Sequence, residues 1–409
     1  MLQLRGGEVS RELKNRLLLK SCRRVEGDPT AVVEALLEGG ADPSVQDANG
    51  LSALMYAASF GRREIVVALL KAGALLEAKG PNGFTALIIT AAKGHEACVN
   101  ALLKGGADIE AKDHSVWTAL MYAAFNGHGS TVRALLLHGA ETDHQGLTGC
   151  TALTVSAGTG RMASVAGLLE GGADLERHDR EGMTALMHAA QNGHFACVRV
   201  LIQRGASISH VDHNQCTALF GAAGNGYTQV ISSLMAAGAN PNDKDKRGWT
   251  PLIHASENDQ PAAIHTLVEG GAFIDERCGK DQRTALHVAA SKVRLAALHM
   301  LLQLGADPDL NDMGGLSAAD VCGEEANSGQ VYGRELQPEQ ALIQLLHRQS
   351  LWRRRRLMVM LRSKRLSGCL SNATHEDDVD KHLFLLLQRV DELPRWGIES
   401  VYRHIVQFM

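Results

Sequence analysis

The stretch DREGMTALMHAA, residues 179–190, recurs in related form along the chain at a fixed interval. Its Thr-Ala-Leu triplet returns as Thr/Ser-Ala/Pro-Leu at a constant spacing, and only the last spacing is longer, by a single position. The triplets begin at Ser52, Thr85, Thr118, Thr151, Thr184, Thr217, Thr250 and Thr284. A Gly-Ala pair and a step of two apolar residues follow the same period. Three markers in phase predict a repeat array, because a period of this length is typical of stacked structural units.

Each unit has the signals of two short helices. The Thr hydroxyl can accept a free backbone N–H of a first helical turn, and Pro251 stands where a missing N–H costs nothing. An Ala-Ala pair follows, and a glycine such as Gly193 then ends the first helix. The second helix carries the apolar step and ends at the next Gly-Ala pair. Helices this short are marginal alone, so their stability must come from stacking on neighbouring units.

These motifs resemble the ankyrin repeat, whose pattern runs roughly D-x-x-G-x-T-P-L-H-x-A-A. The stretches that match it well are DREGMTALMHAA (179–190), RGWTPLIHAS (247–256) and RTALHVAA (283–290). The resemblance covers roughly residues 20–350. It implies an all-α repeat solenoid, in which helix-turn-helix units are joined by β-hairpin-like fingers. The family's His remains only at His287, so we expect looser hydrogen bonding at the other helix starts.

The repeat period also divides the chain. Residues 1–48 are predicted to hold a degenerate capping repeat, and residues 49–312 eight ankyrin repeats. Residues 313–350 are predicted to form a degenerate C-terminal capping repeat with an insertion. Residues 351–409 form a basic and then apolar helical extension, in which Leu393-Pro394 and the following segment resemble the core of an F-box.

Composition narrows the class of protein. The 409 residues carry a net charge of −4, so no nucleic-acid partner is expected. Eight single cysteines fit a reducing compartment, and there is neither a secretory signal nor an apolar run that could span a bilayer. We expect a monomeric cytoplasmic protein, with the basic cluster at 353–365 as an alternative nuclear-import address.

The residues that could bind a metal or take part in catalysis occupy regular positions of the repeat. His210, His213 and Cys216 have the spacing of metal ligands, but Cys216 holds the pre-Thr position and no fourth ligand accompanies the three. Cys98 and Cys197 are three repeats apart and are interpreted as small buried residues. No catalytic triad or phosphate-binding loop stands apart from the period. We therefore expect no enzyme activity, no cofactor, no bound metal and no small-molecule substrate.

The positions most informative about partner binding are those whose side chains the repeat fold does not require. In ankyrin proteins the residue before the Thr lies on the finger and faces the concave groove, and residues after the Ala pair share that groove. The predicted partner-binding residues are Leu51, Phe60, Phe84, Trp117, Phe125, Met183, Arg247, Trp249 and Arg283. Apolar candidates gather in the N-terminal half, whereas charged ones gather around residues 244–283.

Trp117 and Trp249 hold the same repeat position, four repeats apart. Each indole either contacts a partner, as tryptophans at binding hot spots do, or lies over the neighbouring finger and seals the stack. Val116 replaces the usual turn glycine, so this finger is expected to have an altered shape.

The sequence predicts a non-enzymatic scaffold that binds other proteins through its concave groove and finger tips. The alternative is a substrate adaptor of a ubiquitin ligase, whose F-box-like C-terminal segment would recruit the ligase.

Overall fold

The structure is a computed structural model that describes residues 10–24 and 28–321. The chain divides into two compact units, Met1–Leu346 and His347–Met409, and every described residue falls in the first. The predicted C-terminal capping repeat beyond residue 321, the basic cluster and the F-box-like segment therefore lie outside the described residues.

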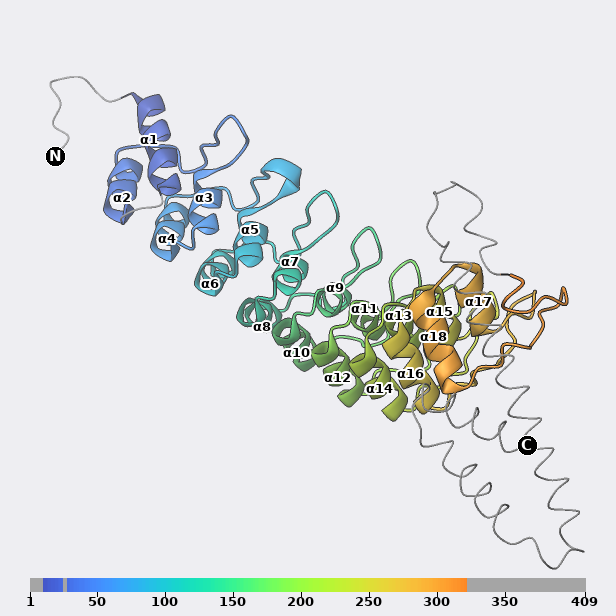
Figure 1. Ribbon diagram of the computed structural model, residues 1–409. Coiled ribbons are helices and arrows are strands. Elements are labelled where there is room, and N and C mark those ends of the chain that lie inside the picture. The colour runs from blue at the N-terminus through green and yellow to red at the C-terminus, as the bar shows by residue number, and fades with distance from the viewer. Residues whose placement is uncertain (1–9, 25–27, 322–409) are drawn as a thin grey trace, which may run out of the picture. The chain divides into compact units, whose positions relative to one another are not determined.

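The described residues form α-helices in consecutive pairs, as the repeat period predicts. The first helices of the pairs are α1 (Arg11–Arg23), α3 (Ala53–Ser59), α5 (Ala86–Lys93), α7 (Ala119–Asn126), α9 (Ala152–Gly158), α11 (Ala185–Gln191), α13 (Ala218–Gly224), α15 (Pro251–Glu257) and α17 (Ala285–Ser291). The second helices are α2 (Thr30–Glu38), α4 (Arg63–Lys71), α6 (Glu96–Lys104), α8 (Gly129–Leu137), α10 (Met162–Glu170), α12 (Phe195–Gln203), α14 (Thr228–Ala236), α16 (Pro261–Glu269) and α18 (Leu295–Leu304). Figure 1 shows neighbouring pairs side by side, with loops projecting between them. The all-α repeat solenoid is confirmed.

Each first helix packs on the first helices of the repeats before and after it, so α11 contacts α9 and α13. The Ala pair makes this close approach possible, and both Ala189 and Ala190 are fully buried. The second helices stack in the same way, and α12 buries Cys197, Val198 and Leu201. One continuous apolar core therefore runs from repeat to repeat, which is how such short helices gain their stability.

The fingers are built on aspartates that organise a tight turn. In the finger before α11, Asp179 Oδ1 accepts hydrogen bonds from the backbone N–H groups of Glu181 and Met183, both at 2.9 Å. Gly182 then takes a φ of +84°, where a side chain would be strained. In the part of the chain that the structure describes, strand pairing is limited to isolated antiparallel bridges, such as the one between His178 and Thr184.

Val116 keeps this finger geometry, so the predicted change of shape was wrong. Its φ is +62°, in the left-handed region that glycine occupies in the equivalent turns. The Trp117 N–H still donates to Asp113 Oδ1 at 2.7 Å, and the Val116 N–H donates to the Asp113 carbonyl at 3.1 Å. The surrounding hydrogen bonds hold a β-branched residue in a conformation that is unfavourable for it.

The predicted loosening at the helix starts is found at α11. The buried Thr184 hydroxyl has no hydrogen-bond partner there. At α17 the family's His is present, and His287 Nδ1 lies 2.8 Å from Thr284 Oγ1. At α9 a threonine replaces the His, and Thr154 Oγ1 accepts the Thr151 N–H at 2.8 Å. The loosening is not general. Ser52, Thr85 and Thr118 each accept the backbone N–H three residues on, at 3.1, 3.3 and 3.5 Å, although no His stands there.

Candidate functional site

Four aromatic side chains from two adjacent repeats form one cluster. We call Phe84, Trp117, Tyr122 and Phe125 the aromatic cluster. The Trp117 ring lies 5.1 Å from the Tyr122 ring and 5.7 Å from the Phe125 ring, measured between centroids. The Phe84 and Tyr122 rings meet edge to face at 5.3 Å. Tilted and edge-to-face arrangements of this kind are the favourable ones for aromatic pairs.

A hydrogen bond fixes the centre of the aromatic cluster. The Tyr122 hydroxyl donates to Asp113 Oδ2 at 2.8 Å, while Asp113 Oδ1 accepts the N–H of Trp117. Burial, with the hydrogen bond to Asp113 and its negative charge, raises the pKa of Tyr122, so this hydroxyl stays a donor at neutral pH. One carboxylate therefore ties the finger that carries Trp117 to the helix that carries Tyr122 and Phe125.

The Trp117 indole also lies against the next finger. A methyl group added at Gly146 would come within 2.9 Å of Trp117 Cδ1 and Nε1, so only glycine leaves room for the ring. Trp117 itself is half-buried. The indole thus seals adjacent fingers, and its remaining surface lines an open hollow.

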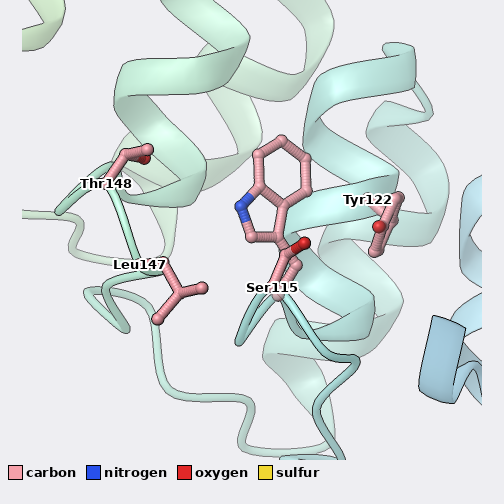
Figure 2. Close-up of a pocket in the computed structure, with 5 residues that line it drawn as sticks. Ser115, Tyr122, Leu147 and Thr148 are labelled. Atoms are coloured by element: carbon pink, nitrogen blue, oxygen red, sulfur yellow. The ribbon is translucent and has the colours of Figure 1, made fainter.

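That hollow has a volume of about 370 Å³. Its walls are formed by Ser115, Trp117, Tyr122, Leu147 and Thr148. Figure 2 shows Tyr122 on one side of the hollow and Leu147 with Thr148, from the next finger, on the other. Leu147 is 52% exposed, and Phe125 at the rim of the aromatic cluster is 40% exposed. Exposed apolar side chains that adjoin one another beside a hollow make this surface a candidate for partner binding.

Trp249, like Trp117, packs against a glycine of the next finger, but its surroundings are more polar. A methyl group at Gly279 of the next finger would lie 3.1 Å from Trp249 Nε1. The Arg247 guanidinium lies over the indole, 4.0 Å from the ring centroid, in a cation–π contact. The exposed face of this indole is therefore partly covered by the chain itself.

Several cations of the predicted charged zone are paired within the protein. Lys244 Nζ lies 2.7 Å from Glu276, and Arg283 Nε lies 3.2 Å from Asp312 of the next finger. Arg247 Nε lies 3.3 Å from Asp245. These acids compete with any acidic partner, so the zone presents less positive charge than the sequence suggests.

The other predicted residues stand on separate repeats. Leu51 and Met183 are half-buried at the finger positions before α3 and α11, and Phe60 is exposed just after α3. Of the predicted set, the structure therefore brings together Phe84, Trp117 and Phe125 in the aromatic cluster, and separately Arg247 and Trp249.

Sequence reasoning missed Tyr122 and Leu147. Tyr122 lies within the first helix, at a repeat position whose residue varies along the chain. The residues there are Tyr56, Ile89, Tyr122, Val155, His188, Gly221, His254 and Val288. That variability was the available signal. Leu147 lies on the neighbouring finger, and its closeness to Trp117 follows only from the stacking.

Three groups of described residues have the donor atoms and spacing of metal ligands. They are Cys150 with Asp179 and His188, Cys216 with Asp245 and His254, and Glu110 with Glu141 and His144. Cys216 thus joins residues of the next repeat, and not His210 and His213 as the sequence spacing suggested. Burial, followed by the negative charges of Asp212 and Asp245, raises the pKa of the Cys216 thiol to about 12. A thiol that is protonated at neutral pH is a poor nucleophile.

The similarity of this chain to known proteins lies in its repeats. The model of the family described as ankyrin repeats (3 copies) matches residues 18–113, 120–212, 168–245 and 219–312, which together make up most of the chain. The chain belongs to the ankyrin repeat family. Among solved structures, the crystal structure of the human ASB11 ankyrin repeat domain is similar, with 26% sequence identity and a TM-score of 0.50. The match covers 54% of this chain and 98% of that one.

No curated protein matches the chain. Ankyrin repeats serve as scaffolds that bind other proteins, and they are generally not enzymes. No helix among residues 10–24 and 28–321 is both long and apolar enough to cross a membrane.

Proposed function

We propose that this ankyrin repeat protein binds a partner protein through the aromatic cluster and the hollow beside it. The observation that carries the proposal is exposed apolar surface beside Trp117: Leu147 lines the hollow of about 370 Å³, and the exposed Phe125 ring packs on Trp117. A hollow of this size can accept one large apolar side chain of a partner.

The mechanism is recognition by a preformed surface. Asp113 fixes the finger and the Tyr122 ring through hydrogen bonds of 2.7 and 2.8 Å, and Gly146 positions the indole. Because these side chains are already ordered, little conformational entropy is lost when a partner binds. Trp and Tyr at the centre of such a site are the residue types that dominate binding energy at interfaces.

The test compares two double variants of the full chain with matched composition. Phe125→Ser/Leu147→Ser removes the apolar wall that Leu147 gives the hollow and the exposed ring that packs on Trp117. Leu75→Ser/Phe273→Ser makes the same chemical changes at positions that are 64% and 62% exposed, on the loops that follow α4 and α16. Proteins that co-purify with the wild type should be retained by the second variant and lost by the first.

Thermal melting of both variants provides the folding control. We expect a small loss for Phe125→Ser/Leu147→Ser, about 1 kcal/mol, from the ring contact with Trp117. If the two double variants retain the same partners, the hollow is not the binding site and the proposal fails.

A further inference from the structure

A cluster of metal-ligand type lies between two successive repeats. Cys150 precedes the N-cap of α9, Asp179 lies in the next finger and His188 lies on α11. His188 Nε2 is 2.8 Å from Asp179 Oδ2, and the sulfur, oxygen and nitrogen ligand atoms all lie within 4.8 Å of one another. Cys150 and His188 are half-buried and Asp179 is nearly buried.

The backbone orients the carboxylate of this cluster. Asp179 Oδ1 is held by the N–H groups of Glu181 and Met183, which leaves Oδ2 directed toward His188. Partners that fix a ligand in this way raise metal affinity, because the ligand loses little freedom when the ion binds.

The donor set suits zinc. Zinc in proteins is bound by thiolate, imidazole and carboxylate groups, with bond lengths that place neighbouring ligand atoms about 3.3–3.6 Å apart. The nitrogen and oxygen atoms lie 2.8 Å apart and the sulfur lies within 4.8 Å of both, so the three donors are close enough to converge on one ion after side-chain rotation. Binding would release the Cys150 thiol proton to solvent and leave one coordination position for water.

The chain contains a second copy of the cluster, two repeats later, that differs in one important way. Cys216, Asp245 and His254 repeat the three ligands, with His254 Nε2 at 2.9 Å from Asp245 Oδ2. Here Arg247 places its guanidinium 3.3 Å from Asp245 Oδ2 and 3.4 Å from His254 Nε2. A fixed positive charge at these two atoms repels a metal cation from the second cluster.

The equivalent of Arg247 in the first cluster is Glu181, which holds the same repeat position two repeats earlier. Glu181 adds a negative charge two residues from Asp179, so it favours a cation where Arg247 opposes one. Two earlier repeats show the aspartate tie without metal-ligand chemistry, because Asp47 and Asp113 bond to the hydroxyls of Tyr56 and Tyr122. The hydrogen bond between the aspartate and its partner therefore has a structural role that needs no metal. The two later clusters differ from the tyrosine pairs because each contains a thiol and an imidazole.

We propose that Cys150, Asp179 and His188 bind one zinc ion, and that the Arg247 guanidinium takes the place of a metal in the second cluster. The site belongs to the ankyrin stack itself and is independent of the aromatic cluster. Because its ligands come from two repeats, it would hold neighbouring fingers together.

The test titrates the untagged, metal-free full chain with Co²⁺, followed by displacement with Zn²⁺. A thiolate ligand gives Co²⁺ an intense near-ultraviolet charge-transfer band, which the carboxylate cluster around Glu110 cannot produce. We expect one equivalent of Co²⁺ with this band. Cys150→Ser should abolish the band, and His188→Gln should weaken binding at least about tenfold. The matched control Cys216→Ser should retain the band at full intensity.

Arg247→Glu tests the second half of the proposal and should add a second equivalent with the same band. Circular dichroism melting checks that every variant folds. Absence of the band in the wild-type chain, or its persistence in Cys150→Ser, would overturn the zinc site. A single equivalent in Arg247→Glu would overturn the role given to the guanidinium.

Discussion

At the scale of single residues, this ankyrin repeat protein carries local strain at Val116. Its φ of +62° places a β-branched side chain in the left-handed region. That conformation costs an L-residue about 1–2 kcal/mol, and part of this is offset because glycine loses more entropy on folding. We therefore expect Val116→Gly to stabilise the protein by about 1 kcal/mol, measured from the urea midpoint.

Gly50 provides the control for Val116, since it holds the same turn position with a φ of +79° and open space around its Cα. Gly50→Val should destabilise the protein by a comparable amount, because it adds the strain without a steric clash. A lower urea midpoint for Val116→Gly would show that the valine side chain contributes more by packing than it costs by strain.

A second residue-scale prediction concerns pH. Burial lowers the pKa of His287 below its ordinary value, against the smaller opposing effects of its hydrogen bond to the Leu316 carbonyl and of Asp312. The folded state therefore prefers the neutral imidazole. The stability contribution is complete above the pKa of the unfolded chain, about 6.5, and is lost as the pH falls from there through the folded pKa.

His287→Gln isolates this effect, because glutamine can also complete a capping box with Thr284 but does not titrate. Urea unfolding across the acid range should show a shallower loss of stability for the variant than for the wild type. Parallel pH profiles for the two proteins would mean that His287 does not titrate differently in the folded and unfolded states.

At the scale of elements, an aspartate joins the finger to its own first helix in every second repeat. Tyr122→Phe removes the hydroxyl that donates to Asp113 Oδ2 and leaves a nearly buried carboxylate oxygen without that partner. Hydrogen bonds to charged groups contribute about 1.5–3 kcal/mol, so we expect a loss of about 2 kcal/mol in the free energy of unfolding.

Tyr227→Phe is the matched change, at a tyrosine that is exposed at the start of α14. It should alter the urea midpoint little. Equal effects of the two substitutions would show that the tie between finger and helix is not what stabilises the repeat.

At the scale of the whole molecule, the aspartate ties recur in every second repeat, so their period is twice that of the helix pairs. Asp47 and Asp113 pair with tyrosines, whereas Asp179 and Asp245 pair with histidines. The change of partner divides the described array into an aromatic part, which holds the hollow, and a part that holds the two thiol-containing clusters.

The fold followed from sequence because the ankyrin period is local. The Thr, the Ala pair and the glycine mark each helix within a single repeat, and the structure places helices there. The candidate binding site could be predicted from the sequence only in part, since it depends on contacts between repeats. Trp117 was predicted from its position, but its neighbours Gly146 and Leu147 lie one finger away, and the approach of Cys150 to His188 joins two successive repeats.

The central claim is that a partner occupies the hollow beside Trp117, and site-specific photo-crosslinking tests it most directly. A photoreactive amino acid is placed at position 147 of the full chain, and in a matched protein at position 75, which is at least as exposed. Cells expressing each protein are irradiated, and covalent adducts are identified by mass spectrometry. We predict that one defined partner crosslinks from position 147 and not from position 75. The same adducts from both positions, or none from position 147, would contradict it.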